Sequence, residues 1–418
     1  MADLKQQLLD WIEEDRRTLE GFFSDFVATP TPNPPGDTRK AVAHIRRFLD
    51  EHGLTHRVID PEPMFPNVVA SFDGSGEGRH LVLNGHIDVF PATPEPWTHG
   101  SPWSGAVEDG AVWGRGSADM KCGTSASIFT YMYLSRLREH LGGRLTLTCV
   151  SDEETFGPWG ARYLMEHHPE VHGDCCLNGE PSSPFSIRFA EKGPWWVTFH
   201  VTTRGAHGAY THAGDSASLV AMDFCRDLQA AVDAIHVDPP HNIGRAIDDA
   251  RDTLDRAMGE GAHAIIQKVT CNIGVIESGL KVNVIPGSAT IEADFRLPVG
   301  CDRETVQPVV EGVLARWPQV TMEEQNYMGP SWCDPHGDMV GILQDNVEAL
   351  AGYRPQPVVS LGGTDARLWR YRGIDAYVYG PFPTGMGQRD EHVRLDDFFH
   401  VIRSHALSAF DYLDGARS

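Results

Sequence analysis

The segment His80–Pro91, HLVLNGHIDVFP, carries the clearest indication of the fold. Its first part, His80–Asn84, is short and mostly apolar, which predicts a buried strand, and the chain then turns through His86 and Asp88. Strands that are apolar on both faces are typical of parallel sheets covered by helices. In open sheets of this kind, ligands bind at the carboxyl ends of the strands. The segment therefore predicts a central strand with a polar site at its end.

Similar apolar runs occur at Asn67–Phe72 and Arg144–Ser151. They alternate with helical periodicity at 39–52 and 120–140, after an amphipathic helix predicted at 4–24. Alternating strands and helices predict an α/β fold with a mostly parallel sheet flanked by helices.

A different pattern begins near residue 193. Its order is β-α-β-β-α-β, which is typical of a ferredoxin-like α+β sandwich. The predicted elements are strands at Trp195–Thr203, Thr270–Glu277, Ser288–Leu297 and 318–326, and helices at 215–235 and 303–317. Because the first pattern returns after about residue 330, we expect a main domain of residues 1–192 and 328–418 and an inserted domain of residues 193–327. Residues 236–268 are extra to this order, and we expect them to form an acidic, solvated helix.

The composition argues against several classes of protein. The 418 residues include 35 Lys or Arg and 58 Asp or Glu, for a net charge of −23, and the basic residues are scattered. Nucleic acid and membrane surfaces are therefore not expected as partners, because both are bound by concentrated positive charge. The chain has no long apolar run and no export signal, and its eight cysteines form no C-x-x-C pair, so we expect a cytoplasmic protein with reduced thiols. Adjacent Cys175 and Cys176 leave a redox role open.

Two segments carry acidic residues beside a predicted helix or strand. The segment Gly114–Gly123, GRGSADMKCG, places Asp119 just before an apolar helix, where it would be either a helix cap or a carboxylate that bridges two cations. Asp152, Glu153 and Glu154 follow a predicted strand directly. Three adjacent carboxylates repel one another unless a cation or a shared proton compensates them, and a solvated acidic turn is the alternative.

Glu180 and His392 are two further candidate site residues. Glu180 comes after a short strand at Cys175–Leu177, and His392 lies in a predicted loop before a C-terminal helix, where an ordinary surface histidine is the alternative. A metal-bound imidazole needs its second nitrogen held by a partner, and Asp88 is placed to do this for His86. Alone this pair is weak, because the chain contains three more His-x-Asp triplets.

In their order along the chain, these five segments resemble the co-catalytic metallohydrolases that include acetylornithine deacetylase, succinyl-diaminopimelate desuccinylase, aminoacylase and glutamate carboxypeptidase. The resemblance covers nearly the whole chain and implies two metal sites that share one carboxylate. The implied ligands are His86, Asp119 and Glu180 in one site, and Asp119, Glu154 and His392 in the other. It also implies that Glu153 is the general base and acid and that Asp88 orients His86. Histidine and carboxylate ligands suit two divalent ions per subunit, with Zn²⁺ first and Mn²⁺ or Co²⁺ as alternatives.

The resemblance extends to the inserted domain, which in this family is a lid and dimerisation domain. His207, in TTRGAHGAY, resembles the family histidine that reaches a neighbouring subunit and stabilises the tetrahedral oxyanion. This role implies a homodimer or a larger homo-oligomer. Gly208, Ala209 and Tyr210 follow His207 where the family carries Ser or Thr and often Pro, so an ordinary loop histidine remains the alternative.

Four more residues are implied to bind substrate. Asn283 and Arg296 lie in a segment that resembles the one near the substrate carboxylate, and an Arg fork binds a carboxylate through two hydrogen bonds. An ion pair between Arg296 and a local acid is the alternative. In the loop LGGTDAR, Gly363 permits close approach of the main chain and Thr364 can donate a hydrogen bond.

The sequence as a whole predicts a metal-dependent hydrolase that cleaves a C–N amide bond of a small N-acyl amino acid-like substrate. Water activated by metal would attack the carbonyl group, with a Glu as general base. A dipeptidase or carboxypeptidase, or a hydrolytic deaminase of an aromatic amine, is the alternative within enzymes. From another class, the chain could be a non-catalytic small-molecule binding protein on the same fold.

Overall fold

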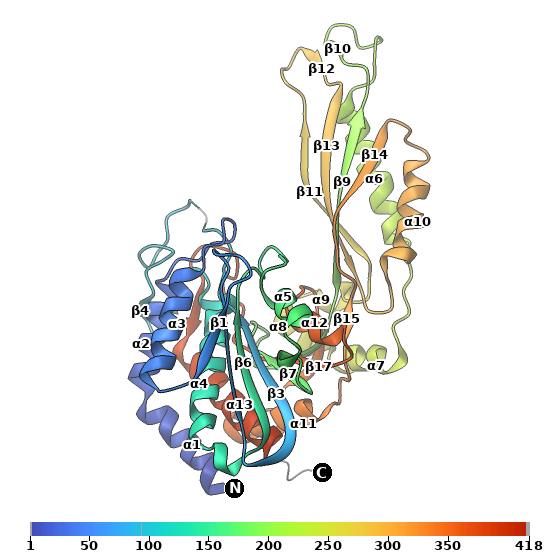
Figure 1. The fold of residues 1–418 in the computed structure, drawn as a ribbon. Coiled ribbons are helices and arrows are strands. Elements are labelled where there is room, and N and C mark those ends of the chain that lie inside the picture. The colour runs from blue at the N-terminus through green and yellow to red at the C-terminus, as the bar shows by residue number, and fades with distance from the viewer. Residues whose placement is uncertain (1, 93, 415–418) are drawn as a thin grey trace. The chain divides into compact units, whose positions relative to one another are not determined.

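The computed structural model describes residues 2–92 and 94–414, which form two compact units (Figure 1). The first unit comprises Met1–Phe189, Cys333–Val358 and Thr364–Ser418, and the second comprises Ala190–Trp332 and Val359–Gly363. Residue 1 and residues 415–418, which the predicted main domain includes, lie outside the described residues. The assignment of Val359–Gly363 to the second unit was not expected from the sequence.

The larger sheet has nine strands among the described residues, in the order β1-β2-β6-β3-β7-β17-β8-β15, with β16 also paired to β8. Its central strands β6, β3, β7 and β17 run parallel, whereas the strands on either side pair antiparallel. The mainly parallel centre confirms the predicted fold class. The strands are β1 His56–Ile59, β2 Asn67–Asp73, β3 Gly76–His86, β6 Gly142–Val150, β7 Cys175–Asn178, β8 Ser186–Glu191, β15 Ser331–Trp332, β16 Gln356–Ser360 and β17 Asp375–Val378.

Helices cover both faces of the parallel centre (Figure 1). On one face α4 and α13 pack against each other and against β3. On the other, α5 and α12 pack over an apolar cluster that includes Val82 and Val378. The helices of this unit are α1 Ala2–Glu14, α2 Arg16–Val27, α3 Arg39–Glu51, α4 Cys122–Arg136, α5 Ala161–His167, α11 Asp338–Ala351, α12 Ala366–Arg370 and α13 Leu395–Leu413. The single helix predicted at 4–24 is two helices, because Asp15, with ψ of 3°, leaves the helical region.

The start of α4 lies against the segment that follows β7. A Cβ atom at Gly123 would overlap the carbonyl oxygen of Gly179, and a Cβ atom at Gly179 would clash with Gly123 in return. Any larger residue at either position would force the two main chains apart. This contact keeps the turn before α4 close to Glu180, the residue after Gly179.

The second unit has the predicted ferredoxin-like arrangement. Its four-stranded sheet has the order β11-β13-β9-β14, with all neighbours antiparallel. The helices α6 and α10 cover a core built on alternate residues of β9, among them Trp195, Val197 and Phe199. The elements are β9 Gly193–Thr202, α6 Ala217–Asp233, β11 Thr270–Ser278, β13 Ser288–Leu297, α10 Arg303–Leu314 and β14 Val320–Tyr327, with a two-stranded ribbon of β10 Ala206–His207 and β12 Val284–Ile285.

The extra segment 236–268 differs from the prediction. It forms three short helices, α7 His241–Asp249, α8 Arg251–Met258 and α9 Ala262–Ile265, instead of one. Gly259, with φ of 100°, ends α8 because a residue in that conformation cannot continue a right-handed helix. The acidic composition of the segment therefore did not predict its interruptions.

A small three-stranded sheet brings distant parts of the first unit together. It consists of β4 Ala106–Glu108, β5 Ala111–Trp113 and β18 His392–Arg394, in the order β18-β5-β4. His392 pairs with Trp113 in this sheet. The histidine that was predicted to lie in a loop is therefore the first residue of a strand.

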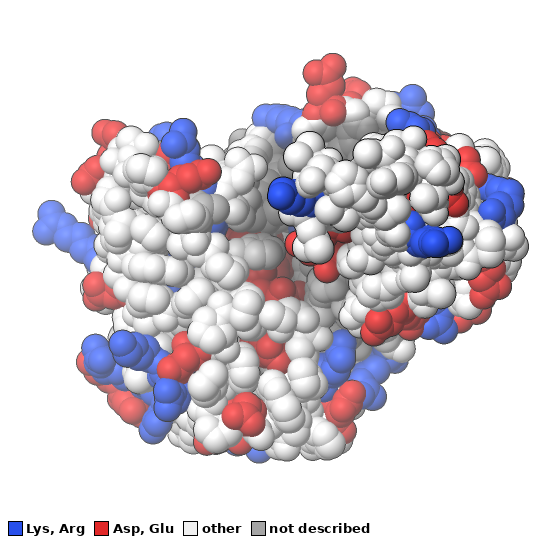
Figure 2. Space-filling view, turned by 90° about the horizontal axis from the view of Figure 1, so that it is seen from above, with Lys and Arg blue, Asp and Glu red and all other residues white. Residues whose placement is uncertain are grey.

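Charged side chains are interspersed on the face drawn in Figure 2. Lys and Arg lie there in small groups between Asp and Glu. Within residues 2–92 and 94–414, no helix has the length and apolarity that a membrane crossing needs.

Candidate metal centre

Three buried side chains converge at the carboxyl edge of the parallel strands. His86 is the last residue of β3, Glu180 follows β7, and Asp119 lies in the turn η1, Ser117–Lys121, before α4. Nε2 of His86 is 3.1 Å from Oδ1 of Asp119 and 3.1 Å from Oε1 of Glu180. One ligand atom from each residue lies within 4.8 Å of the other two, which is a group that could hold a metal ion. One imidazole nitrogen and two carboxylates match the ligand preferences of Zn²⁺ and similar divalent ions.

The charges of this group are strongly coupled. Burial acts to lower the pKa of His86, but the negative charges of Glu180 and Asp119 outweigh it and raise that pKa well above its usual value. Burial, with the charge of Asp119, raises the pKa of Glu180 to about 7. Two carboxylates in one buried place repel each other, and a bound cation would relieve this repulsion.

The orientation of His86 is fixed by its other nitrogen. Nδ1 lies 2.9 Å from the main-chain carbonyl oxygen of Asp88, which can only accept, so Nδ1 carries the proton and donates. Nε2, which faces Asp119 and Glu180, is therefore the nitrogen that could bind a metal ion. The predicted partner was the carboxylate of Asp88, whose Oδ1 is farther away, at 3.6 Å from Nδ1. The turn brings the carbonyl group of Asp88 closer to the ring than its side chain.

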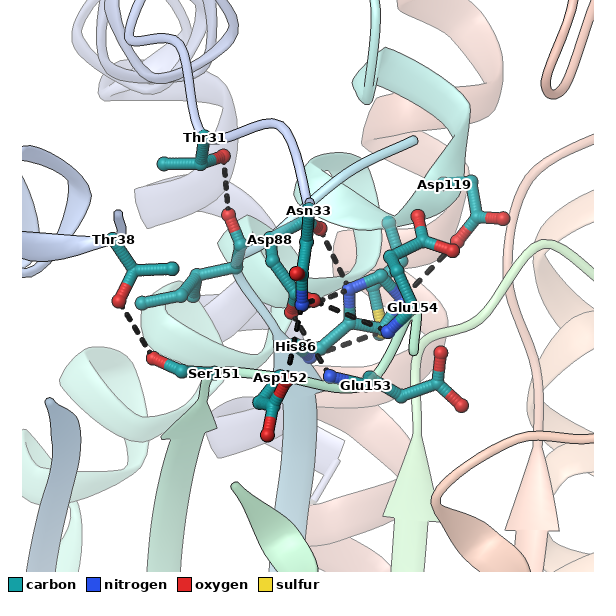
Figure 3. A network of polar contacts seen from close by, with 12 residues as sticks. Thr31, Asn33, Thr38, His86, Asp88, Asp119, Ser151, Asp152, Glu153 and Glu154 are labelled. Carbon is teal, nitrogen blue, oxygen red and sulfur yellow. Dashed lines mark hydrogen bonds and ion pairs between the residues drawn. The ribbon is translucent and has the colours of Figure 1, made fainter. Parts of the chain in front are cut away.

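The carboxylate of Asp88 has a different set of partners (Figure 3). It accepts the main-chain N–H groups of Glu153 at 3.2 Å and Glu154 at 3.1 Å, and Nδ2 of Asn33 at 2.8 Å. Asp88 thus holds the acidic turn after β6 next to His86. Asn33 was not singled out from the sequence, since a lone Asn in a Pro-rich segment carries no motif.

The carboxylate of Asp152 is occupied by hydrogen bonds within the protein. It accepts from Asn33 Nδ2 at 3.2 Å, Thr155 Oγ1 at 2.9 Å and the N–H of Trp159 at 3.2 Å. Of the three adjacent acids, only Glu153 and Glu154 are therefore candidates for binding a metal ion or transferring a proton.

Glu153 is buried and paired with a basic residue from α12. Nη1 of Arg367 lies 3.3 Å from Oε1 of Glu153, and the Arg367 guanidinium lies 4.7 Å from the centre of the Phe156 ring. Burial raises the pKa of Glu153 well above its usual value. Arg367 was not predicted as a site residue, although it is the last residue of the predicted substrate-binding segment LGGTDAR.

Glu154 has an unsatisfied oxygen. Oε1 is buried and has no hydrogen-bond partner among the described residues. Burial and the charge of Asp119 raise the pKa of Glu154 well above its usual value. Buried polar atoms are nearly always satisfied, so an orphaned carboxylate oxygen beside Asp119 fits a ligand of a second cation.

His392 also presents one free nitrogen. Its Nδ1 donates to the carbonyl oxygen of Asp390 at 2.8 Å, so Nε2 is the nitrogen that could bind a metal ion. Its ring stacks on Trp113 with 3.9 Å between the ring centres. Glu154 and His392 do not belong to the group of three found among the described residues, so the structure brings three of the five predicted ligands together directly.

Comparison with known proteins agrees with this geometry. The sequence profile of peptidase family M20/M25/M40 matches residues 82–410. The chain belongs to this family. Membership confirms the resemblance read from the five motifs and makes the chain a metal-dependent hydrolase that acts on a small-molecule substrate.

Relatives of this M20/M25/M40 chain include a desuccinylase and an aminoacylase. It is 28% identical over 388 residues to succinyl-diaminopimelate desuccinylase 2 of Ruegeria sp. (strain TM1040), covering 89% of each chain. It is 24% identical over 403 residues to aminoacylase-1 of Sus scrofa, covering 91% of each. Among solved structures, an M20 family metallo-carboxypeptidase, Sso-CP2 from Sulfolobus solfataricus, has a TM-score of 0.79 at 18% identity, with 96% of this chain and 99% of that chain covered. The dipeptidase Dug1p from Saccharomyces cerevisiae has a TM-score of 0.80 at 14% identity, with both chains fully covered.

The remaining predicted residues of the M20/M25/M40 chain lie mostly in the second unit. His207 is exposed on β10, and the adjacent Gly208 donates its N–H to the carbonyl oxygen of Asn283 at 2.8 Å, so His207 and Asn283 are neighbours. Arg296, on β13, donates through Nε to Oδ2 of Asp294 at 3.0 Å. This is the local ion pair that was the alternative to a substrate contact. Gly363 ends the Val359–Gly363 segment of the second unit.

Thr364 begins the returning segment of the first unit and is buried. Its Oγ1 accepts the N–H of Ala366 at 3.3 Å, which positions the start of α12. Arg367, the partner of Glu153, belongs to the same helix. Thr364 is thus bonded into the helix that carries a residue of the centre.

Proposed function

We propose that the chain hydrolyses a C–N amide bond in a small N-acyl amino acid-like substrate that carries a carboxylate. The observation that carries the proposal is the convergence of two buried carboxylates on Nε2 of His86, beside the orphaned Oε1 of Glu154. The names of the desuccinylase and aminoacylase relatives support an N-acyl amino acid as the substrate class.

We further propose that two divalent ions bind, Zn²⁺ first, with Mn²⁺ and Co²⁺ as alternatives. His86, Asp119 and Glu180 would hold one ion, and Asp119, Glu154 and His392 the other. When bound, the ions would supply Lewis acidity and lower the pKa of water. Nδ1 of each histidine is held by a main-chain carbonyl oxygen, so Nε2 is the nitrogen that would bind the ion.

Glu153 is proposed as the general base and acid. It would accept a proton from the attacking water at a carboxylate oxygen and deliver that proton to the leaving nitrogen. Its burial supports the role, because a raised pKa suits a carboxylate that must hold a proton during the reaction. Arg367 would orient the carboxylate through Oε1, and Asp88 would hold the turn through two main-chain N–H groups.

The second unit is proposed as a lid and dimerisation domain. Leu280 and Val282, close in sequence to Asn283, are 97% and 100% exposed, and exposed apolar side chains of this kind favour a protein contact. In a homodimer, His207 of one subunit would stabilise the oxyanion in the other. Arg296 would bind the substrate carboxylate after exchanging its bond to Asp294, and Asn283, Gly363 and Thr364 would complete the substrate contacts.

A cytoplasmic location is also proposed. All eight cysteines are free, and Cys175 and Cys176 are both buried. Free thiols are typical of reducing compartments. Burial raises the pKa of both thiols well above the usual value, which argues against reactive cysteines.

The decisive experiment measures metal content and substrate range together. Protein stripped of metal is loaded separately with Zn²⁺, Mn²⁺ or Co²⁺ and assayed on N-succinyl and N-acetyl amino acids, dipeptides and aromatic amines. We expect two ions per chain and hydrolysis of N-acyl amino acids. Full activity in protein shown to contain no metal would overturn the mechanism, and preference for dipeptides or aromatic amines would assign one of the alternative activities.

A further inference from the structure

We propose that Glu391 is a positioning residue for the metal centre. Its side chain fixes the turn that carries Asp119, and the peptide chain joins it directly to His392. The inference rests on the proposed function, in which Asp119 and His392 bind the same ion. It concerns how the distance between these two ligands, which are far apart in sequence, is fixed.

One carboxylate oxygen of Glu391 gathers three main-chain N–H groups of the turn. Oε1 accepts from Gly116 at 3.1 Å, Ala118 at 3.0 Å and Asp119 at 3.1 Å. The donors are at least 272 residues away in sequence. Because the N–H of Asp119 is among them, a shift of this carboxylate would move the main chain of the ligand itself.

The other oxygen, Oε2, forms an ion pair with Nη1 of Arg115. Both side chains are 1% exposed. The guanidinium of Arg115 lies 5.5 Å from the centre of the Trp97 ring, and its Nε and Nη2 have no hydrogen-bond partner among the described residues. A buried charge that loses its partner is strongly unfavourable, so the pair restricts Glu391 to one position.

The main chain of Glu391 is fixed as well. Its carbonyl oxygen accepts the N–H of Gly114 at 2.9 Å. The next residue, His392, pairs with Trp113 between β18 and β5, and its ring stacks on the same tryptophan. Glu391 is therefore held by its backbone on the His392 side and by its carboxylate on the Asp119 side. Residues that orient ligands from outside the coordination sphere commonly change metal affinity or activity by about 10–100-fold when mutated.

The test uses two substitutions and one control. Glu391→Ala removes the acceptor, and Glu391→Gln keeps an oxygen that can accept N–H bonds but removes the charge. The control is Asp411→Ala, because the mostly buried Asp411 accepts from Lys5 Nζ at 2.7 Å and Asn346 Nδ2 at 2.9 Å and has no part in the proposed centre. Each protein is stripped of metal and titrated with Zn²⁺ alone, and hydrogen exchange of residues 114–121 is measured without metal.

We expect wild-type protein to bind two ions. In Glu391→Ala, the affinity for at least one of the two ions should fall about 10–100-fold, because Asp119 is a proposed ligand of both, and amides of residues 114–121 should exchange faster. Glu391→Gln should fall between wild type and Glu391→Ala in both measurements. In the active Glu391 variants, kcat should fall more than KM changes, since no substrate contact is removed, whereas Asp411→Ala should keep both values.

Wild-type affinity for both ions in the Glu391 variants would overturn the inference, as would an equal loss in Asp411→Ala. If Glu391→Ala does not fold, Glu391→Gln decides by the same two readouts. A wild-type chain that binds fewer than two ions would instead contradict the proposed function. The two failures are therefore distinguishable.

Discussion

Arg367 and Glu153 form a buried pair across 214 residues of sequence, with 3.3 Å between Nη1 and Oε1. Arg367 is 3% exposed at its side chain and Glu153 is 7% exposed. One oxygen of the proposed base is thus held by a cation from α12, while its main-chain N–H is held by Asp88. Both bonds orient Glu153, in keeping with its proposed role as a base and not a ligand.

The first prediction follows from this separation of roles. Glu153→Ala should keep both metal ions but lose about 10³-fold in kcat, which is within the range expected for removal of a general base or acid. Metal content by mass spectrometry and steady-state kinetics on an N-acyl amino acid test this. Loss of metal with the activity would show that Glu153 is a ligand.

The second prediction concerns Arg367. Arg367→Met should lower kcat by about 10-fold or more with metal content unchanged, because Glu153 would lose the contact that orients it. Arg367→Lys should recover part of the loss, since it keeps the charge but not the planar fork. Arg354→Met, an exposed Arg of the same unit with local partners Asp345 and Glu348, is the control and should keep full activity. Unchanged kcat in Arg367→Met would contradict the role.

The third prediction concerns subunit exchange. If His207 acts across subunits, mixing inactive Glu153→Ala with inactive His207→Ala should restore part of the activity, because a mixed dimer contains one site with both residues intact. The measurement is activity after exchange, with mixed dimers shown by native mass spectrometry. Proven mixed dimers without activity would place His207 outside the reaction.

The fourth prediction concerns pH and stability. Burial lowers the pKa of His400 and of His405 to about 4, with Arg403 adding to the effect at His400. His400 contacts the hydroxyl group of Tyr379 at 2.6 Å, and His405 donates through Nε2 to the carbonyl oxygen of Tyr379 at 2.7 Å. Between the usual histidine pKa near 6.5 and about 4, the unfolded chain binds more protons, so stability falls as pH falls through this window.

Each histidine should contribute on the order of 2 kcal/mol to the loss between pH 7 and pH 5. His405→Gln keeps a donor for Tyr379 but cannot be protonated, so its melting temperature should fall less than that of wild type over this range. Calorimetry on metal-free protein at both pH values measures the difference. Equal falls in wild type and His405→Gln would exclude protonation of His405 as a cause.

The sequence predicted those parts of the fold and the site that depend on local pattern. His86, Glu154 and Glu180 could be placed near one another because each follows a strand of one parallel sheet, and parallel strands end at a common edge. The antiparallel strands β8 and β15 could not be foreseen, since β8, SIRFAE, mixes polar and apolar residues and β15 has only two residues. The interruption at Asp15 was missed because the apolar periodicity continues across it.

The missed residues act through long-range contacts. Arg367 and Glu391 show their partners, Glu153 and the turn before Asp119, only after distant segments have packed together. For Asp88, the sequence suggested a bond from its carboxylate to His86, but the main-chain carbonyl makes the bond, because the exact path of the turn decides which oxygen lies closer. Motifs indicate which residues meet, and tertiary packing decides which atoms touch.

The small sheet β18-β5-β4 has a consequence for synthesis on the ribosome. Three predicted ligands, His86, Asp119 and Glu180, leave the ribosome long before β18, which carries His392, has been translated. However, the first unit is discontinuous, and its last segment supplies β17 to the sheet and Glu391 to the turn of Asp119, so we expect the group around His86 to be complete only after that segment has folded. If two ions bind as proposed, full metal content would then report that β17 and β18 have both packed into the first unit.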